Sequence, residues 1–188
     1  MQISANHTAY ARKRAVLAAA GFALWGALGA WFFIIQWHQS WPLVLFYIIL
    51  VLNTFFSVRT FASITPPQHI GQQLWDGLLV IFFLAMPLQF HSPLSFTLLA
   101  TGLFIISVFK YVSLFPVVGF SPLLYAKIRI NTLGVLLCVA AVIGVLSGHP
   151  LWSSILWTGI FLFANVYILW WQPLYRLDMH RSYEKHQK

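Results

Sequence analysis

Long apolar segments separated by short polar stretches occupy most of the chain. Each segment has 17–23 residues, and none alternates strictly between apolar and polar residues as a membrane β-strand does. A helix of that length, at about 1.5 Å per residue, crosses most or all of a hydrocarbon core about 30 Å thick. Helices also satisfy their own backbone hydrogen bonds in lipid. The predicted transmembrane helices are 15–37, 42–58, 74–90, 95–115, 131–147 and 151–171.

The basic residues lie on alternate connections between these segments. The short turns 38–41, 91–93 and 148–150 contain no Lys or Arg. Ten of the 11 basic residues lie in the other connections and the two tails: Arg12, Lys13, Arg14, Arg59, Lys127, Arg129, Arg176, Arg181, Lys185 and Lys188. Because cytoplasmic segments of membrane proteins are rich in Lys and Arg, both termini are predicted to be cytoplasmic. The predicted fold is an all-α integral membrane protein with six transmembrane helices in three hairpins.

This pattern divides the chain into a basic tail 1–14, a six-helix domain 15–172 and a second basic tail 173–188. The composition agrees, because 60% of residues are hydrophobic and only 7% are charged, against about 25% charged in soluble domains. It excludes a soluble globular protein and a nucleic-acid binder. The basic residues of the predicted cytoplasmic segments account for most of the formal charge of +8. They also favour anionic lipid headgroups on the cytoplasmic side. We expect a multi-pass protein of a bacterial inner membrane.

Two ionisable residues fall inside the predicted spans, where charge is costly and often functional. Asp76 begins the third span and Lys110 lies near the inner end of the fourth. These spans are joined by a short turn, so we expect them to be antiparallel neighbours with an Asp76–Lys110 ion pair. Further polar residues at similar depth complete a predicted ligand-binding pocket that faces the cytoplasm. Its members are Asn53, Arg59, Asp76, Lys110, Asn131 and Asn165.

The same residues also have a purely structural interpretation. Asp76 sits at a helix start, where a carboxylate favours the helix dipole. Lys110 and Arg59 can extend their amines to the interface, and the asparagines can join helices by hydrogen bonds. The single cysteine, Cys138, lies in an apolar run and is predicted to act as a small buried hydrophobe.

Small residues recur every four positions in the first span, at Ala15, Ala19, Ala23 and Ala27. Such residues share one helix face and allow another helix to approach closely. They predict an interface with a helix of this chain, a second copy or a membrane partner subunit. With six spans and both ends inside, the chain resembles the substrate-binding subunits of energy-coupling-factor vitamin transporters. That resemblance implies that the four alanines dock a transmembrane coupling subunit, although the outer turns here are much shorter.

The leading functional hypothesis is a transporter or channel-like protein for a small solute or ion. The alternative is a non-catalytic membrane subunit or assembly factor that acts through helix contacts. A lipid-modifying enzyme built on His69, Asp76, Asp178 and His180 is a third possibility. No cofactor or metal is predicted. The outer histidines His38, His91 and His149 leave metal binding or pH sensing open.

Overall fold

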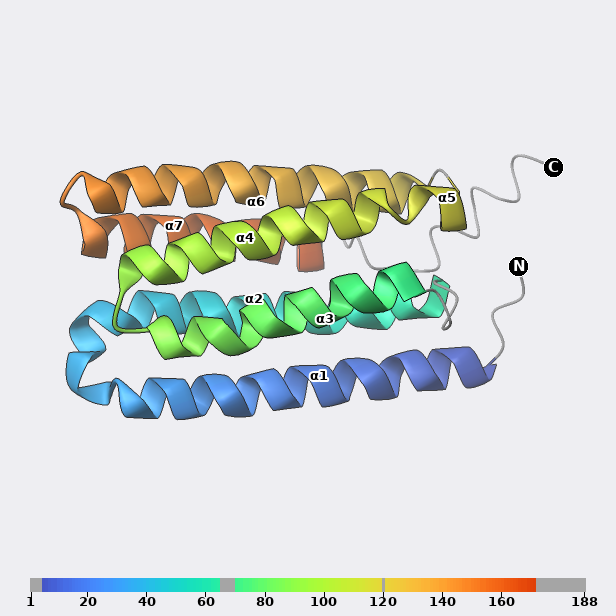
Figure 1. Cartoon of the computed structure of the whole chain (residues 1–188), viewed down its shortest axis with the longest axis horizontal. Helices are drawn as coiled ribbons and strands as arrows, with labels where there is room; N and C mark the ends of the chain where they lie inside the picture. The colour runs from blue at the N-terminus through green and yellow to red at the C-terminus, as the bar shows by residue number, and fades with distance from the viewer. Residues whose placement is uncertain (1–4, 65–69, 120, 172–188) are drawn as a thin grey trace.

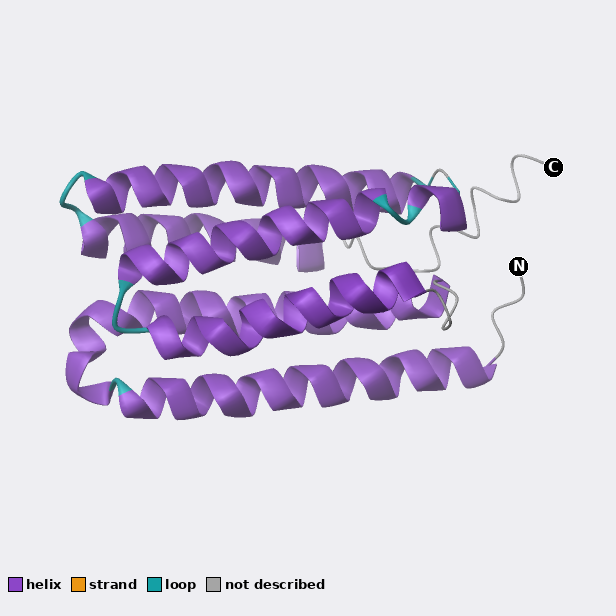
Figure 2. Ribbon diagram, in the orientation of Figure 1, coloured by secondary structure: helices purple, strands orange, loops and turns teal. Residues whose placement is uncertain are grey.

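The computed structural model describes residues 5–64, 70–119 and 121–171. This part of the chain is helical and contains no strand (Figure 2). Within it, six helices are long and apolar enough to cross a membrane. Their main elements are α1 (Ala5–Phe32), α2 (Trp37–Ile64), α3 (Ile70–Ala85), α4 (Pro93–Val112), α6 (Pro122–Leu146) and α7 (Pro150–Val166), and the third and sixth continue through short helical turns to Gln89 and Trp171. Shorter elements are η1 (Ile34–Gln36), η2 (Met86–Gln89), α5 (Phe115–Val118) and the π-helix η3 (Tyr167–Trp171).

The long helices alternate in direction along one bundle axis (Figure 1). The turns after α1, η2 and α6 lie at one end, which we call the turn end. The chain enters α1 at the opposite end, which we call the basic end, because Arg12, Lys13 and Arg129 lie there. The hairpin partners α1 and α2, α3 and α4, and α6 and α7 contact each other, and α7 on α2 and α6 on α4 join the hairpins.

An aromatic cluster fills the bundle toward the turn end. The ring of Phe46 stacks on Trp157 and Phe161, with ring centroids 3.9 Å and 4.3 Å away. Phe96 meets Phe46 edge-on at 5.9 Å. These residues come from α2, α4 and α7, so their contacts hold three helices together. In lipid, helix association depends on such close van der Waals contact rather than on removing apolar surface from water.

The outer surface of the bundle is strongly apolar. Ile35 is 96% exposed and Trp170 is 86% exposed, and large apolar side chains are exposed on every long helix. A soluble monomer rarely exposes so much continuous apolar surface. Together with the six long apolar helices, this surface indicates a multi-pass membrane protein.

The first turn lies earlier than the sequence pattern predicted. The chain leaves α1 at Phe32, turns through 33–36 and starts α2 at Trp37, so the predicted turn residues 38–41 belong to α2. Ser40 Oγ donates a hydrogen bond to the Gln36 carbonyl at 3.1 Å within this first turn of helix. Phe33, Ile34 and Ile35 are as apolar as the spans on either side, which is why hydropathy did not mark the turn.

The helices α1 and α6 extend furthest beyond their predicted spans at the N-terminal end. α1 starts at Ala5 rather than 15, and Arg14 is therefore helical. α6 starts at Pro122, before the predicted span 131–147, and it continues unbroken through Lys127 and Arg129; Ser121 followed by Pro122 is the sequence signal for this start. Pro is favoured in the first turn of a helix, where its missing N–H is not needed. In both helices the charged residues extend the helix instead of ending it.

Candidate functional site

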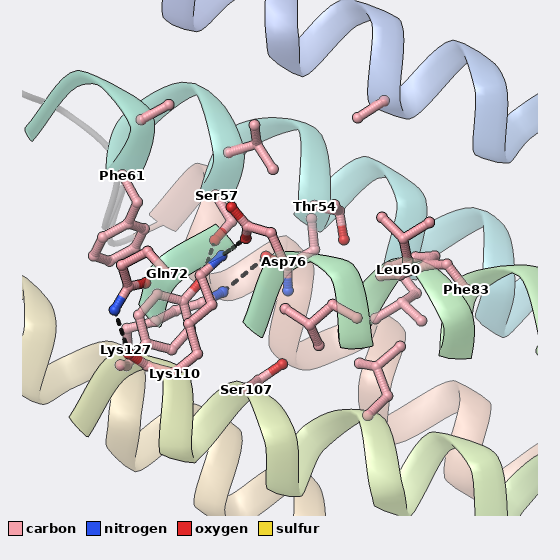
Figure 3. A pocket seen from close by; sticks show the side chains of 18 of the residues that line it. Leu50, Thr54, Ser57, Phe61, Gln72, Asp76, Phe83, Ser107, Lys110 and Lys127 are labelled. Atoms are coloured by element: carbon pink, nitrogen blue, oxygen red, sulfur yellow. Dashed lines mark hydrogen bonds and ion pairs between the residues drawn. The ribbon is translucent and has the colours of Figure 1, made fainter. Parts of the chain in front are cut away.

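A cavity of about 620 Å³ lies between α1, α2, α3, α4 and α6 toward the basic end of the bundle. Around it, α3 contacts α4 and α1, and α2 contacts α1 and α7. Figure 3 shows side chains from four helices pointing toward one another at its polar end, with Ser57, Asp76, Lys110 and Lys127 among them. The volume lies within the range of about 300–1,000 Å³ of small-molecule sites.

The structure brings four of the six predicted ligand-binding residues to this cavity. Asn53, Asp76, Lys110 and Asn131 line it. Arg59 is exposed on α2 and is not among the lining residues. Asn53, Ser57 and Phe61 recur every four residues and line the cavity from one face of α2, and Arg59 lies off that face.

Asn165 also lies away from the cavity lining. It is buried on α7, and its Nδ2 donates to the Phe161 carbonyl of its own helix at 2.8 Å. Its Oδ1 has no hydrogen-bond partner. The helix that carries it is held against α2 and α6 and contributes no residue to the cavity wall.

Asp76 is the centre of a charged cluster at the cavity mouth. Its Oδ1 accepts a hydrogen bond from Lys110 Nζ at 2.5 Å, and its Oδ2 accepts one from Arg14 Nη2 at 2.9 Å. The predicted Asp76–Lys110 ion pair is confirmed. Arg14 was missed because the sequence pattern assigned it to the tail 1–14. The cluster joins α1, α3 and α4.

Lys127 is a second charged residue that the sequence reasoning missed. It was assigned to a cytoplasmic connection, whereas the structure places it in α6 with only 4% of its surface exposed. Its Nζ donates to Asn53 Oδ1 at 3.2 Å. Lys127, Asn131, Gly134, Cys138 and Ala141 are buried at helical spacing along α6. That stripe of polar and small residues was the signal that this face of the helix is covered.

Tyr111 lies between the two lysines. Its ring centroid is 5.8 Å from Lys110 Nζ and 5.9 Å from Lys127 Nζ, so its π face stabilises both ammonium groups. Its hydroxyl shares a 2.6 Å hydrogen bond with Ser57 Oγ. The ring therefore places two cations on one wall of the cavity.

Two buried polar atoms in the wall have no hydrogen-bond partner. Gln72 is 5% exposed, and its Nε2 donates to Ser113 Oγ at 3.0 Å, but its Oε1 is unpartnered. Asn131 is 4% exposed, and its Nδ2 is unpartnered. Buried polar atoms are nearly always hydrogen-bonded, and an exception needs an explanation. Both residues belong to the cavity lining, and the two unpartnered atoms themselves are buried in its wall.

The inner end of the cavity is apolar. Phe22, Leu50, Phe83, Leu103 and Phe104 line this part, which we call the floor. The rings of Phe22 and Phe83 stack with centroids 4.4 Å apart, and all five residues are buried. The cavity therefore has a charged mouth and an apolar floor.

The four alanines of α1 divide between two environments. Ala15 is fully buried and Ala19 is half-buried, whereas Ala23 and Ala27 are exposed. Closer to the turn end, Gly26 rather than alanine faces the neighbouring helix, since a Cβ there would lie 2.5 Å from the Tyr47 ring. The contact face of α1 thus turns away from the predicted stripe.

Other predicted features can also be located. Cys138 is buried and forms no disulfide, which confirms the prediction that it is a buried side chain of the core. Among the described residues, no three His, Cys, Asp or Glu side chains form a group suited to a metal ion. The His91 ring lies 4.7 Å from that of Phe33. His69, Asp178 and His180, which the enzyme hypothesis required, lie outside the described residues.

No family model, curated protein or solved structure matched the chain. The site is therefore interpreted from its own geometry.

Proposed function

We propose that the protein binds a small solute in this cavity and moves it across a bacterial inner membrane as a transporter or channel-like protein. The observation that carries the proposal is the convergence of Asn53, Asp76, Lys110 and Asn131 on one cavity of about 620 Å³. Polar and ionisable residues in membrane helices are costly, and they commonly mark solute or ion pathways.

The proposed orientation places the basic end in the cytoplasm. Arg12, Lys13 and Arg129 are exposed at this end, and basic residues favour the cytoplasmic side and its anionic headgroups. The turn end would then face outward. In this orientation the cavity receives its solute from the cytoplasm or releases it there.

The Asp76 cluster gives this proposal a place where the bundle can change shape. Arg14, Asp76 and Lys110 tie α1, α3 and α4 together by two ion pairs at the cavity mouth. These side chains are partly exposed, so water and solutes can compete for them. Loosening the two pairs frees α3 to move relative to α1, which widens or closes the mouth.

Cysteine accessibility tests whether the cavity is open to water from the proposed side. Ser107→Cys would be introduced into a Cys138→Ala background and treated with membrane-impermeant thiol reagents in oriented vesicles. Ser107 lines the cavity, so we expect labelling from the cytoplasmic side. Ser154→Cys is the matched control, because Ser154 is buried and lies outside the cavity lining. Equal, low reactivity of the two cysteines would contradict the proposal.

A second candidate function is a non-catalytic membrane subunit or assembly factor. It is favoured by the exposure of Ala23 and Ala27, small residues one turn apart on the outside of α1. Native mass spectrometry of protein extracted in mild detergent tests it. The subunit hypothesis predicts a complex that is lost in Ala23→Leu with Ala27→Leu and retained in Leu24→Ala with Leu28→Ala. A wild-type protein that is monomeric and alone would count against it.

A further inference from the structure

We infer that the cavity takes an anionic amphiphile, with a carboxylate or phosphate head beside Lys110, Lys127 and Asn131 and a short hydrocarbon tail on the apolar floor. The inference rests on the proposed function and names the solute class of the same site. The charge of the cavity wall, its hydrogen-bond donors and its shape each support this solute class.

The wall of the cavity contains more basic than acidic side chains. Among the described residues that line the cavity, Arg14, Lys110 and Lys127 are basic and Asp76 is acidic, and three minus one gives the lining a formal charge of +2. Asp76 already pairs with Arg14 and Lys110. Repulsion between like charges is strong where water is scarce. An anion therefore gains from this wall, whereas a cation is repelled by it.

Hydrogen-bond donors for an anionic head group lie close together on α6. Asn131 follows Lys127 by four residues on α6, so both project from one face about one helical turn apart. Asn131 Nδ2 is buried in the wall and has no partner, so a rotation of this side chain toward the cavity would let an oxyanion accept hydrogen bonds from the amide and from the lysine ammonium together. Such charge-assisted hydrogen bonds are the stronger kind.

The cavity has an apolar part next to the proposed site of the head group. The cavity continues from Lys110 and Lys127 to the floor formed by Phe22, Leu50, Phe83, Leu103 and Phe104. An inorganic ion would leave this apolar part unused. A hydrocarbon tail that binds there is transferred from water to an apolar surface. Each added methylene should therefore raise the binding affinity about fourfold until the floor is covered. Head and tail together explain why one cavity has two kinds of wall.

Binding to the whole protein in nanodiscs of neutral phosphatidylcholine tests the inference. Calorimetric titrations with octanoate and octyl phosphate would be corrected with empty nanodiscs. We expect both to bind at least about tenfold more tightly than octyltrimethylammonium, because a head of reversed charge loses the charge-assisted hydrogen bonds. Hexanoate should bind about sixteenfold more weakly than octanoate, since it lacks two methylenes. Equal binding of the cationic amphiphile would overturn the inference.

The probes also separate the sources of the head. Inorganic phosphate that binds as well as octyl phosphate would overturn the role of the tail. Octanoate binding that is lost when anionic phosphatidylglycerol is added to the nanodiscs would show that a lipid headgroup can occupy the site, and this supports the same head chemistry from the bilayer.

Matched variants on α6 locate the head. We expect Lys127→Met to weaken octanoate binding by roughly tenfold or more, the usual loss for a hydrogen bond to a charged group. Octanol binding should stay unchanged. Arg129→Met removes a charge from the exposed side of the same helix and should leave octanoate affinity unaltered. An equal loss in Arg129→Met would show that surface charge, not the cavity, attracts the anion.

Asn131→Asp is the second test, should Lys127→Met not fold. It replaces the unpartnered donor with a carboxylate of similar size, so octanoate binding should be lost while octanol still binds. Unchanged octanoate binding would overturn the inference. If Ser107→Cys is labelled but anions are not preferred, only the solute class fails. If Ser107→Cys is unreactive, the proposed function fails as well.

Discussion

A carboxylate inside a membrane helix needs compensating charge, and Asp76 has two cations. Arg14 and Lys110 each bind a different oxygen of its carboxylate, so both lone-pair regions are used and two helices are held to α3. Lys127 is compensated in another way, by the Asn53 amide oxygen and the Tyr111 ring. The same wall thus contains one neutralised cluster and one buried cation.

Asp76→Asn should lower the stability of the folded protein. Without the carboxylate, Arg14 and Lys110 face each other unpaired. We expect a loss of about 1–2 kcal/mol, less than for a fully buried pair because Asp76 and Arg14 are 31% and 43% exposed. Thermal unfolding in detergent measures it. Adding Lys110→Met removes one of the repelling charges and should restore part of the loss, and an unchanged midpoint in the single variant would contradict this account.

The Tyr111 hydroxyl offers a second test at a single bond. Tyr111→Phe removes the 2.6 Å hydrogen bond to Ser57 but keeps the ring between the two lysines. We expect a cost of about 1 kcal/mol. Ser57→Ala should cost a similar amount, and the double variant little more than either single one, because both remove the same bond. Fully additive losses in thermal unfolding would show that the two residues act separately.

Two glycines at helix crossings allow the helices to approach closely. A Cβ on Gly134 would lie 2.7 Å from the Phe104 ring where α6 crosses α4, and one on Gly26 would lie 2.5 Å from Tyr47 where α1 crosses α2. The Tyr47 hydroxyl donates to the carbonyl of Phe83 at 3.1 Å and lies 3.3 Å from that of Phe22, so this ring connects three helices. Close helix contacts built on small residues are typical of membrane bundles.

Gly26→Val should push α1 away from α2 and strain the Tyr47 bridge. We expect a destabilisation of about 1–3 kcal/mol, as for other overfilled contacts. Gly21→Val on the same helix is the control, because a Cβ there meets nothing within 4 Å. Thermal unfolding of both variants separates the contact from helix propensity. Equal midpoints would mean that Gly26 is not needed for the contact.

The two ends of the whole bundle differ in what fills them. The aromatic cluster around Phe46 closes the turn end, while the cavity and the basic residues occupy the other end. Under the proposed function, a bundle that is closed at one end and hollow at the other would admit its solute from one side of the membrane. The orientation of the whole molecule would then decide from which compartment the solute enters.

Reporter fusions test this orientation. Alkaline phosphatase, which is active only outside the cytoplasm, should be active when fused after residues 36, 91 and 148. It should be inactive after residues 64 and 119, which follow helices running toward the basic end. The reason is that Lys and Arg favour the cytoplasmic side. Activity after residue 64, or its absence after residue 91, would reverse the proposed topology.

Much of the architecture was contained in local sequence pattern. Six apolar segments predicted six helices, because the length and hydropathy of a span depend only on consecutive residues. The Asp76–Lys110 pair was also predictable, since two spans joined by a short turn must lie side by side. The asymmetric distribution of Lys and Arg predicted the orientation that the fusions will test.

Tertiary structure decided which side of a helix faces the protein wherever no polar stripe marks that side. The stripe on α6 marks its covered face, whereas the membrane part of α1 is apolar all round, and Ala23 and Ala27 face outward although Ala15 is buried. Arg14 and Lys127 entered the cavity only because their helices begin earlier than hydropathy indicates and three-dimensional contacts orient them. Composition determined that these helices form, and contacts between distant segments determined where the cavity lies.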